Sequence, residues 1–64
     1  MGKRIVVLGA GISGVGAAVL AKNNGFDVFV SDKGMIADKN KKLFSDNNIK
    51  WEENGHTINR IIGV

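Results

Sequence analysis

Residues 5–18 read Ile-Val-Val-Leu-Gly-Ala-Gly-Ile-Ser-Gly-Val-Gly-Ala-Ala, and the predicted fold follows from this run of residues. The apolar run Ile5–Leu8 stops at Gly9, and an unalternating run of this kind is typical of a parallel strand covered on both faces. From Ile12 to Asn24 the pattern changes to that of a helix with small residues along one side. The stretch therefore predicts a strand, a tight turn and a helix in succession.

The turn carries glycines in the pattern Gly-x-Gly-x-x-Gly, at Gly9, Gly11 and Gly14. Gly9 would permit the sharp turn, Gly11 would let a diphosphate approach the backbone, and Gly14 would let helix and strand pack closely. Amides around Gly11–Gly14 and the positive helix end would then bind the anion. Asp32 follows about 20 residues on, at a strand end, which is typical of nucleotide-binding loops. The alternative is that the glycines serve only a sharp turn.

The rest of the chain repeats the alternation of strand and helix, with Gly25 as the expected left-handed residue after the first helix. The predicted elements are a strand at Phe26–Asp32, a helix at Ile36–Asn47, a strand at Ile49–Glu53 near the sheet edge, and a last helical turn capped by Thr57. The second helix is expected to share one face among Ile36, Asn40, Leu43, Phe44 and Asn47. This order, β-α-β-α-β-α, predicts an α/β fold with a parallel, right-handed, doubly wound sheet.

The sequence stops at Gly63-Val64, where a doubly wound domain needs a further strand beside the first one. We therefore expect residues 1–64 to be the incomplete N-terminal domain of a longer protein. An unpaired edge on strand Ile5–Leu8 would then favour self-association of the fragment.

Composition limits the class of protein. The chain has 64 residues, a formal net charge of +3 and no cysteine. Its apolar runs are too short to span a bilayer, and its lysines are interspersed with acidic residues rather than clustered. We expect a single soluble, cytoplasmic domain that binds neither nucleic acid nor membranes.

Several other side chains have two interpretations each. Ser13 would donate to a phosphate oxygen or cap the helix. Asp32 would accept hydrogen bonds from ribose hydroxyls or a base N–H, or it would form a turn. Lys33, next to it, would face a polar ligand or only solvent.

No catalytic or metal-binding residues are predicted. His56 is expected to cap a loop and Trp51 to pack between sheet and helix. Ser13, Ser31 and Ser45 lack a nucleophile motif, and we expect no triad with His56. No Walker-type loop occurs, so the sequence itself has no ATP-binding P-loop.

The run Lys3–Gly16 resembles the opening of the Mur ligases, and Phe29–Gly34, Ile49–Glu53 and Gly55–Thr57 strengthen the likeness to members that add D-glutamate. The resemblance implies a Rossmann-like N-terminal domain that holds the UDP part of UDP-N-acetylmuramoyl-L-alanine. The implied contacts are Gly9, Gly11, Ile12, Ser13 and Gly14 at the diphosphate, and Asp32, Lys33 and Gly34 at the uracil. Some family members have Thr-Arg in place of Lys33-Gly34.

The resemblance also implies an ATP-dependent amide ligation in peptidoglycan synthesis, with ATP and magnesium bound by later domains that this sequence does not contain. The chain alone would then be inactive. Two alternatives stay open from the residues themselves. The spacing from Gly9 to Asp32 equally fits the FAD- or NAD-binding half of an oxidoreductase, and the chain could be a non-enzymatic nucleotide-sensing module.

Overall fold

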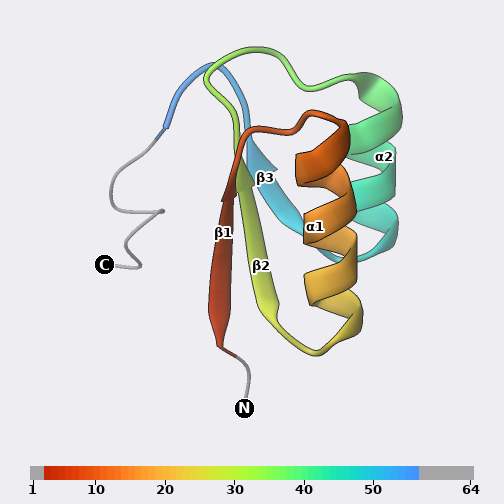
Figure 1. Ribbon diagram of the computed structural model, residues 1–64. Coiled ribbons are helices and arrows are strands. Elements are labelled where there is room, and N and C mark those ends of the chain that lie inside the picture. Colours follow the sequence, from red (N-terminus) through yellow and green to blue (C-terminus); the bar gives the residue numbers. More distant parts are fainter. Residues whose placement is uncertain (1–2, 57–64) are drawn as a thin grey trace.

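The computed structural model describes residues 3–56, and it is an alternation of parallel strands and helices (Figure 1). The elements are β1 (Arg4–Leu8), α1 (Ile12–Asn23), β2 (Asp27–Ser31), α2 (Asp38–Asp46) and β3 (Lys50–Glu52). This confirms the predicted α/β class and its strand–helix order. The helical turn expected from Thr57 lies outside the described residues.

The sheet has the order β1-β2-β3, and both pairs of neighbouring strands are parallel. Leu8 pairs with Ser31, and Ser31 pairs with Glu52, so the three strands end side by side. β3 lies at the edge of the sheet, as predicted. Because the strands are parallel, the loops that leave them all run over one edge, the upper one in Figure 1.

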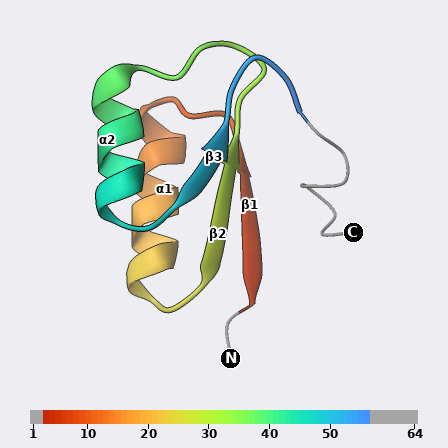
Figure 2. The ribbon, with the colours of Figure 1, turned by 180° about the vertical axis from the view of Figure 1, so that it is seen from behind.

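Both helices lie on the same face of the sheet, as the two opposite views show (Figures 1 and 2). Right-handed crossovers that add each new strand on the same side place their helices this way. The described residues therefore form one helical layer on one sheet, with the loops that follow the strands along the upper edge.

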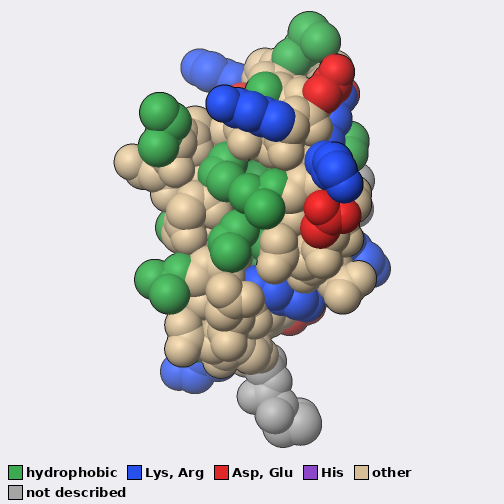
Figure 3. All heavy atoms as spheres, turned by 90° about the vertical axis from the view of Figure 1, so that its right-hand side faces the viewer, with side chains coloured by type: hydrophobic (Ala, Val, Ile, Leu, Met, Phe, Trp, Pro, Cys, Tyr) green, Lys and Arg blue, Asp and Glu red, His purple; other side chains and the backbone are tan. Residues whose placement is uncertain are grey.

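The core lies between the helices and the sheet. Val30 of β2 and Phe44 of α2 are fully buried at its centre, and Trp51 packs against it as predicted. Leu43, expected on the same face of α2 as Phe44, is 37% exposed and is therefore only partly buried. Apolar side chains are nevertheless visible in the middle of the helix-covered side, with charged side chains around them (Figure 3). The buried core residues are Ala10, Ala18, Val28, Val30, Ile36, Phe44 and Ile49.

The second helix begins at Asp38 and not at the predicted Ile36. Ala37 is its N-cap, with an extended ψ of 142°. Ile36 lies in the loop that precedes the helix, and its side chain is buried. Its amide donates to the carboxylate of Glu53, the residue that follows β3. The prediction of the helix start was wrong because Ile36 has helical spacing to Phe44, whereas Ile36 is buried by the loop folding back and not by a turn of helix. Strands β2 and β3 are each one residue shorter at either end than predicted.

The turns use residues that tolerate left-handed backbone. Gly25, after α1, has a φ of +88°, as expected for the residue that ends this helix. Asn48 and Asn54 have φ values of 58° and 63°, a region that asparagine enters more readily than most residues. These turns direct the chain from α2 into β3 and then away from β3.

Candidate functional site

The glycine loop between β1 and α1 is held tightly against the ends of the strands. The Gly9 amide donates to the Ser31 carbonyl at 2.7 Å, and Gly9 has a φ of +103°. A Cβ atom on Gly14 would lie 2.0 Å from the Gly9 carbonyl oxygen. The turn predicted at Gly9 and the close approach predicted at Gly14 are therefore both confirmed.

The N-terminus of α1 lies at the edge of the sheet where the strands end. Gly11 is the N-cap, no side chain caps the helix, and the first bond across the cap runs from the Val15 amide to the Gly11 carbonyl at 2.9 Å. Helix geometry therefore leaves the amides of Ile12, Ser13 and Gly14 directed out of the helix end. A Cβ on Gly11 would meet nothing within 4 Å. The loop thus offers several donors, the positive end of a helix dipole, and space beside its backbone.

Ser13 lies inside the first turn of α1 and is exposed. The N-cap position belongs to Gly11, so the interpretation of Ser13 as the helix cap is wrong. Ile12 beside it is 96% exposed, an unusual state for a large apolar side chain.

Asp32 joins the glycine loop to the loop that follows β2. Its Oδ2 accepts the Ala10 amide at 2.8 Å, and its Oδ1 accepts the Gly34 amide at 2.9 Å. The Ala10 amide, and after it the Gly34 amide, lower the pKa of Asp32 below its ordinary value. The alternative interpretation of Asp32 as a turn-forming residue is therefore confirmed. Each carboxylate oxygen has a further lone pair, so Asp32 can also accept a hydrogen bond from a ligand.

The loop after Asp32 presents Lys33, Gly34 and Met35 at the surface, and Met35 is 80% exposed. The Gly34 carbonyl accepts the Asn54 amide at 2.9 Å, so the turn after β3 supports this loop from behind. The sequence did not predict this support, because it depends on the pairing of β2 with β3. Asn54-Gly55 was predicted only as a turn.

Ser31, Glu52 and His56 meet at the ends of β2 and β3. The buried Ser31 hydroxyl lies 2.8 Å from Oε2 of Glu52 and also contacts Nδ1 of His56. Serine and histidine are thus in contact, but both partners converge on the same hydroxyl. His56 does not stand between the hydroxyl and the carboxylate as it would in a triad. The cluster fastens the turn after β3 to β2, which is the loop-capping role predicted for His56.

Within residues 3–56, no group of three His, Cys, Asp or Glu side chains converges in a way that would hold a metal ion. No helix in that range is both long enough and apolar enough to cross a membrane. The side chains of residues 3–56 therefore do not fit a magnesium site.

Comparison with known proteins identifies the family. The MurD N-terminal domain family matches residues 4–62. The chain belongs to this family. No solved structure matches it.

The relatives of this MurD-type domain are named as ligases. The chain is 62% identical over 62 residues to the UDP-N-acetylmuramoylalanine–D-glutamate ligase of Bacteroides fragilis, and 56% identical over 61 residues to that of Christiangramia forsetii. The enzyme of the same name from Cytophaga hutchinsonii is 42% identical over 64 residues. These matches cover 97%, 95% and 100% of this chain but 14% of each relative. They support the resemblance to the D-glutamate-adding Mur ligases, and none of them supports the oxidoreductase alternative.

In this MurD-type domain, the residues predicted for the site come from two loops at one edge of the sheet. The loop after β1 and the loop after β2 are joined directly by the bond from Ala10 to Asp32. The structure adds a further set behind them that sequence reasoning missed, formed by Ile36, Lys41 and Glu53. The predicted residues brought to this edge are Gly9, Gly11, Ile12, Ser13, Gly14, Asp32, Lys33 and Gly34.

Proposed function

We propose that this chain is the UDP-binding, Rossmann-like domain of a ligase that adds D-glutamate to UDP-N-acetylmuramoyl-L-alanine in cytoplasmic peptidoglycan synthesis. One observation carries the proposal. The uncapped N-terminus of α1 lies beside a carboxylate that bonds both loops, in a chain of the MurD N-terminal domain family. Open amides at a helix end suit a diphosphate, and a carboxylate beside them suits hydroxyl or N–H donors.

Each loop has a distinct part in this proposal. The diphosphate lies over the amides of Ile12, Ser13 and Gly14, in the space that the missing Cβ of Gly11 leaves open. Asp32 and the Lys33-Gly34 turn face the nucleoside end. In this proposal, the base is recognised mainly through Asp32 and the backbone of the Lys33-Gly34 turn.

The ligation itself is assigned to other parts of the protein. The relatives are much longer than the matched segment, which covers 14% of their length. ATP supplies the activating phosphoryl group in the proposed reaction, and we place ATP and magnesium in the remaining sequence. The residues described here bind and orient the nucleotide end of the substrate.

An NMR titration tests the proposal. The ¹⁵N-labelled chain is titrated separately with UDP, UDP-N-acetylmuramoyl-L-alanine, FAD and NAD. We expect UDP and the muramoyl nucleotide to shift the amides of residues 11–14 and 32–34 at lower concentrations than FAD or NAD. A preference for FAD or NAD would overturn the proposal.

Two glycine variants provide the control. Gly11 and Gly16 both have open space where a Cβ would go, but only Gly11 lies at the loop. We expect Gly11→Ala to weaken UDP binding because the methyl group occupies the space for the diphosphate. Gly16→Ala is expected to leave UDP binding unchanged.

A further inference from the structure

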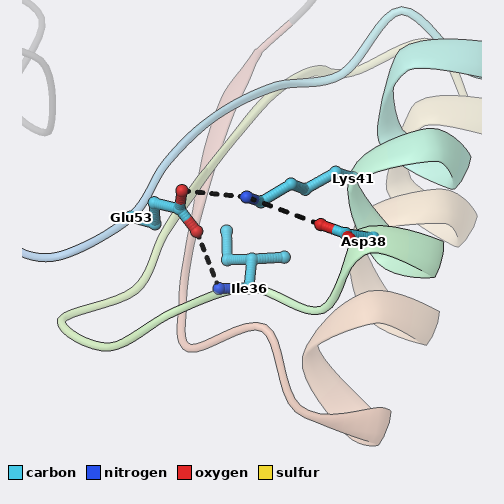
Figure 4. Close-up of polar contacts among 4 residues, drawn as sticks. All are labelled: Ile36, Asp38, Lys41 and Glu53. Atoms are coloured by element: carbon cyan, nitrogen blue, oxygen red, sulfur yellow. Dashed lines mark hydrogen bonds and ion pairs between the residues drawn. The ribbon is translucent and has the colours of Figure 1, made fainter.

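Glu53 follows β3, and its carboxylate connects the turn after β3 to the loop before α2 and to α2 itself (Figure 4). Its Oε1 accepts the Ile36 amide at 3.0 Å, and its Oε2 accepts Nζ of Lys41 at 2.9 Å. Lys41 lies on α2, so this bond connects Glu53 to the helix. One carboxylate thus holds the end of the loop that starts at Asp32.

The segment between Asp32 and Ile36 is fixed at both of its ends. At the first end, the Gly34 amide donates to Oδ1 of Asp32 at 2.9 Å, and the Gly34 carbonyl accepts the Asn54 amide at 2.9 Å. At the second end, the Ile36 amide donates to Glu53. Since the side chain of Ile36 is also buried, the intervening residues have little freedom to move relative to the strand ends.

The ion pair that supports Glu53 is better shielded than an ordinary surface pair. The side chains of Lys41 and Glu53 are 24% and 21% exposed, whereas those of Lys42 and Asp46, also paired on α2, are 78% and 60% exposed. Nζ of Lys41 also lies 5.3 Å from the centre of the Trp51 ring, which fixes the position of the ammonium group. Partly buried pairs of this geometry hold their partners in place more firmly than exposed pairs do.

We propose that Glu53 is a positioning residue for recognition of the base. By holding the Ile36 amide, it sets the conformation of the 33–36 segment, whose Lys33-Gly34 backbone meets the base of the bound nucleotide. This inference rests on the proposed function, in which Lys33-Gly34 faces the nucleoside end. It assigns Glu53 no contact with the ligand.

The test compares a ligand that has a base with one that has none. UDP and inorganic pyrophosphate are titrated by NMR into the 64-residue chain and its variants. We expect Glu53→Ala to weaken UDP binding about three- to tenfold, as for loss of one ordinary hydrogen bond, because Glu53 acts on the ligand only through the loop, and to leave pyrophosphate binding unchanged. Glu53→Gln keeps an oxygen for the Ile36 amide and is expected to restore most of the UDP affinity. Asp46→Ala, which breaks the exposed pair on the same helix, is the matched control and should change neither affinity.

Each remaining outcome has a definite meaning. Equal losses for UDP and pyrophosphate would show general destabilisation and overturn the inference, as would unchanged UDP binding in Glu53→Ala. If Glu53→Ala does not fold, Lys41→Met removes the support of Glu53 while leaving the acceptor of the Ile36 amide, and it should give a smaller loss confined to UDP. Failure of the proposed function is distinguishable, because wild-type chain that binds no UDP shows it before any variant is compared.

Discussion

Gly14 is the position at which a single methyl group has the largest predicted cost. The Cβ of Gly14→Ala would lie 2.0 Å from the Gly9 carbonyl oxygen, so α1 must move away from the glycine loop. We expect this variant to lose about 1–3 kcal/mol of unfolding free energy, as for other overpacked sites. Urea unfolding followed by circular dichroism measures the loss.

Gly16→Ala is the matched control, because it makes the same change on the same helix where a Cβ meets nothing within 4 Å. Alanine is the better helix former, so this variant should gain about 0.5–1 kcal/mol. Equal stabilities of the two variants would contradict the close approach at Gly14.

Asp32 makes the stability of the chain depend on pH in the acid range. Its pKa is lowered in the folded chain, chiefly by the Ala10 amide and then by the Gly34 amide. Its stabilising effect is therefore fully present above the unfolded value of about 3.9 and is lost as the pH falls through the lower folded value. Asp32→Asn should lose about 2 kcal/mol at neutral pH and weaken the acid dependence. Urea midpoints at pH 7 and pH 3 measure both effects.

Asp27→Asn removes an exposed carboxylate from the start of β2, the strand that precedes Asp32, and serves as the control. It should keep the acid-induced loss seen in the wild-type chain. In the wild type, the amide protons of Ala10 and Gly34 should shift together as Asp32 titrates. Independent titration of the two amides would argue against a shared carboxylate.

At the scale of elements, α2 lacks a side-chain cap. Ala37 occupies its N-cap with extended backbone, and no side chain there accepts a hydrogen bond from the first turn. Ala37→Ser supplies a hydroxyl acceptor and should raise the unfolding free energy by about 1 kcal/mol. Thermal and urea unfolding measure the gain.

Ala17→Ser places the same residue at an exposed position inside α1, where serine is a poorer helix former than alanine. A loss of about 0.5 kcal/mol is expected there. If both serine variants shift stability in the same direction, capping is not the cause.

Most elements could be predicted because their signals are local. The Ile5–Leu8 run, the glycine spacing and the left-handed Gly25 each fix a short stretch without reference to the rest of the chain. The start of α2 could not be predicted, since the spacing of Ile36 is compatible with helix and its burial depends on a loop folding back. Local pattern does not reveal that kind of burial.

The candidate site also has one part that could be predicted from local sequence and one part that depends on tertiary structure. The glycine loop and Asp32 could be found from spacing, whereas the grouping of Ser31, Glu52 and His56 depends on the pairing of β2 with β3. The bond from Glu53 to Ile36 depends on that pairing and on the loop before α2. Nothing in the linear order of the residues brings these groups together.

At the scale of the whole molecule, stability depends on a small core. Phe44 is fully buried on α2, whereas Leu43 beside it is 37% exposed. Phe44→Ala should cost about 3–5 kcal/mol, which is comparable to the whole stability expected of so small a domain. We expect this variant to be largely unfolded at 25 °C by circular dichroism.

Leu43→Ala removes an aliphatic side chain from the adjacent position and should cost about 1 kcal/mol or less, because part of that side chain is already in water. A folded Phe44→Ala variant would show that the sheet and helices are held together mainly by other contacts.

The parallel sheet places the candidate site and the helix-to-strand turns at opposite edges, so a label can be attached far from the site. Within residues 3–56, both strand-to-helix loops run over one edge, and the helix-to-strand turns, among them the one after Asn23, lie at the opposite edge (Figure 1). The sequence contains no cysteine, and Asn23 is exposed. An Asn23→Cys substitution therefore creates a single thiol at which a fluorophore or surface tether can be attached, leaving the glycine loop and the Asp32 turn free at the far edge.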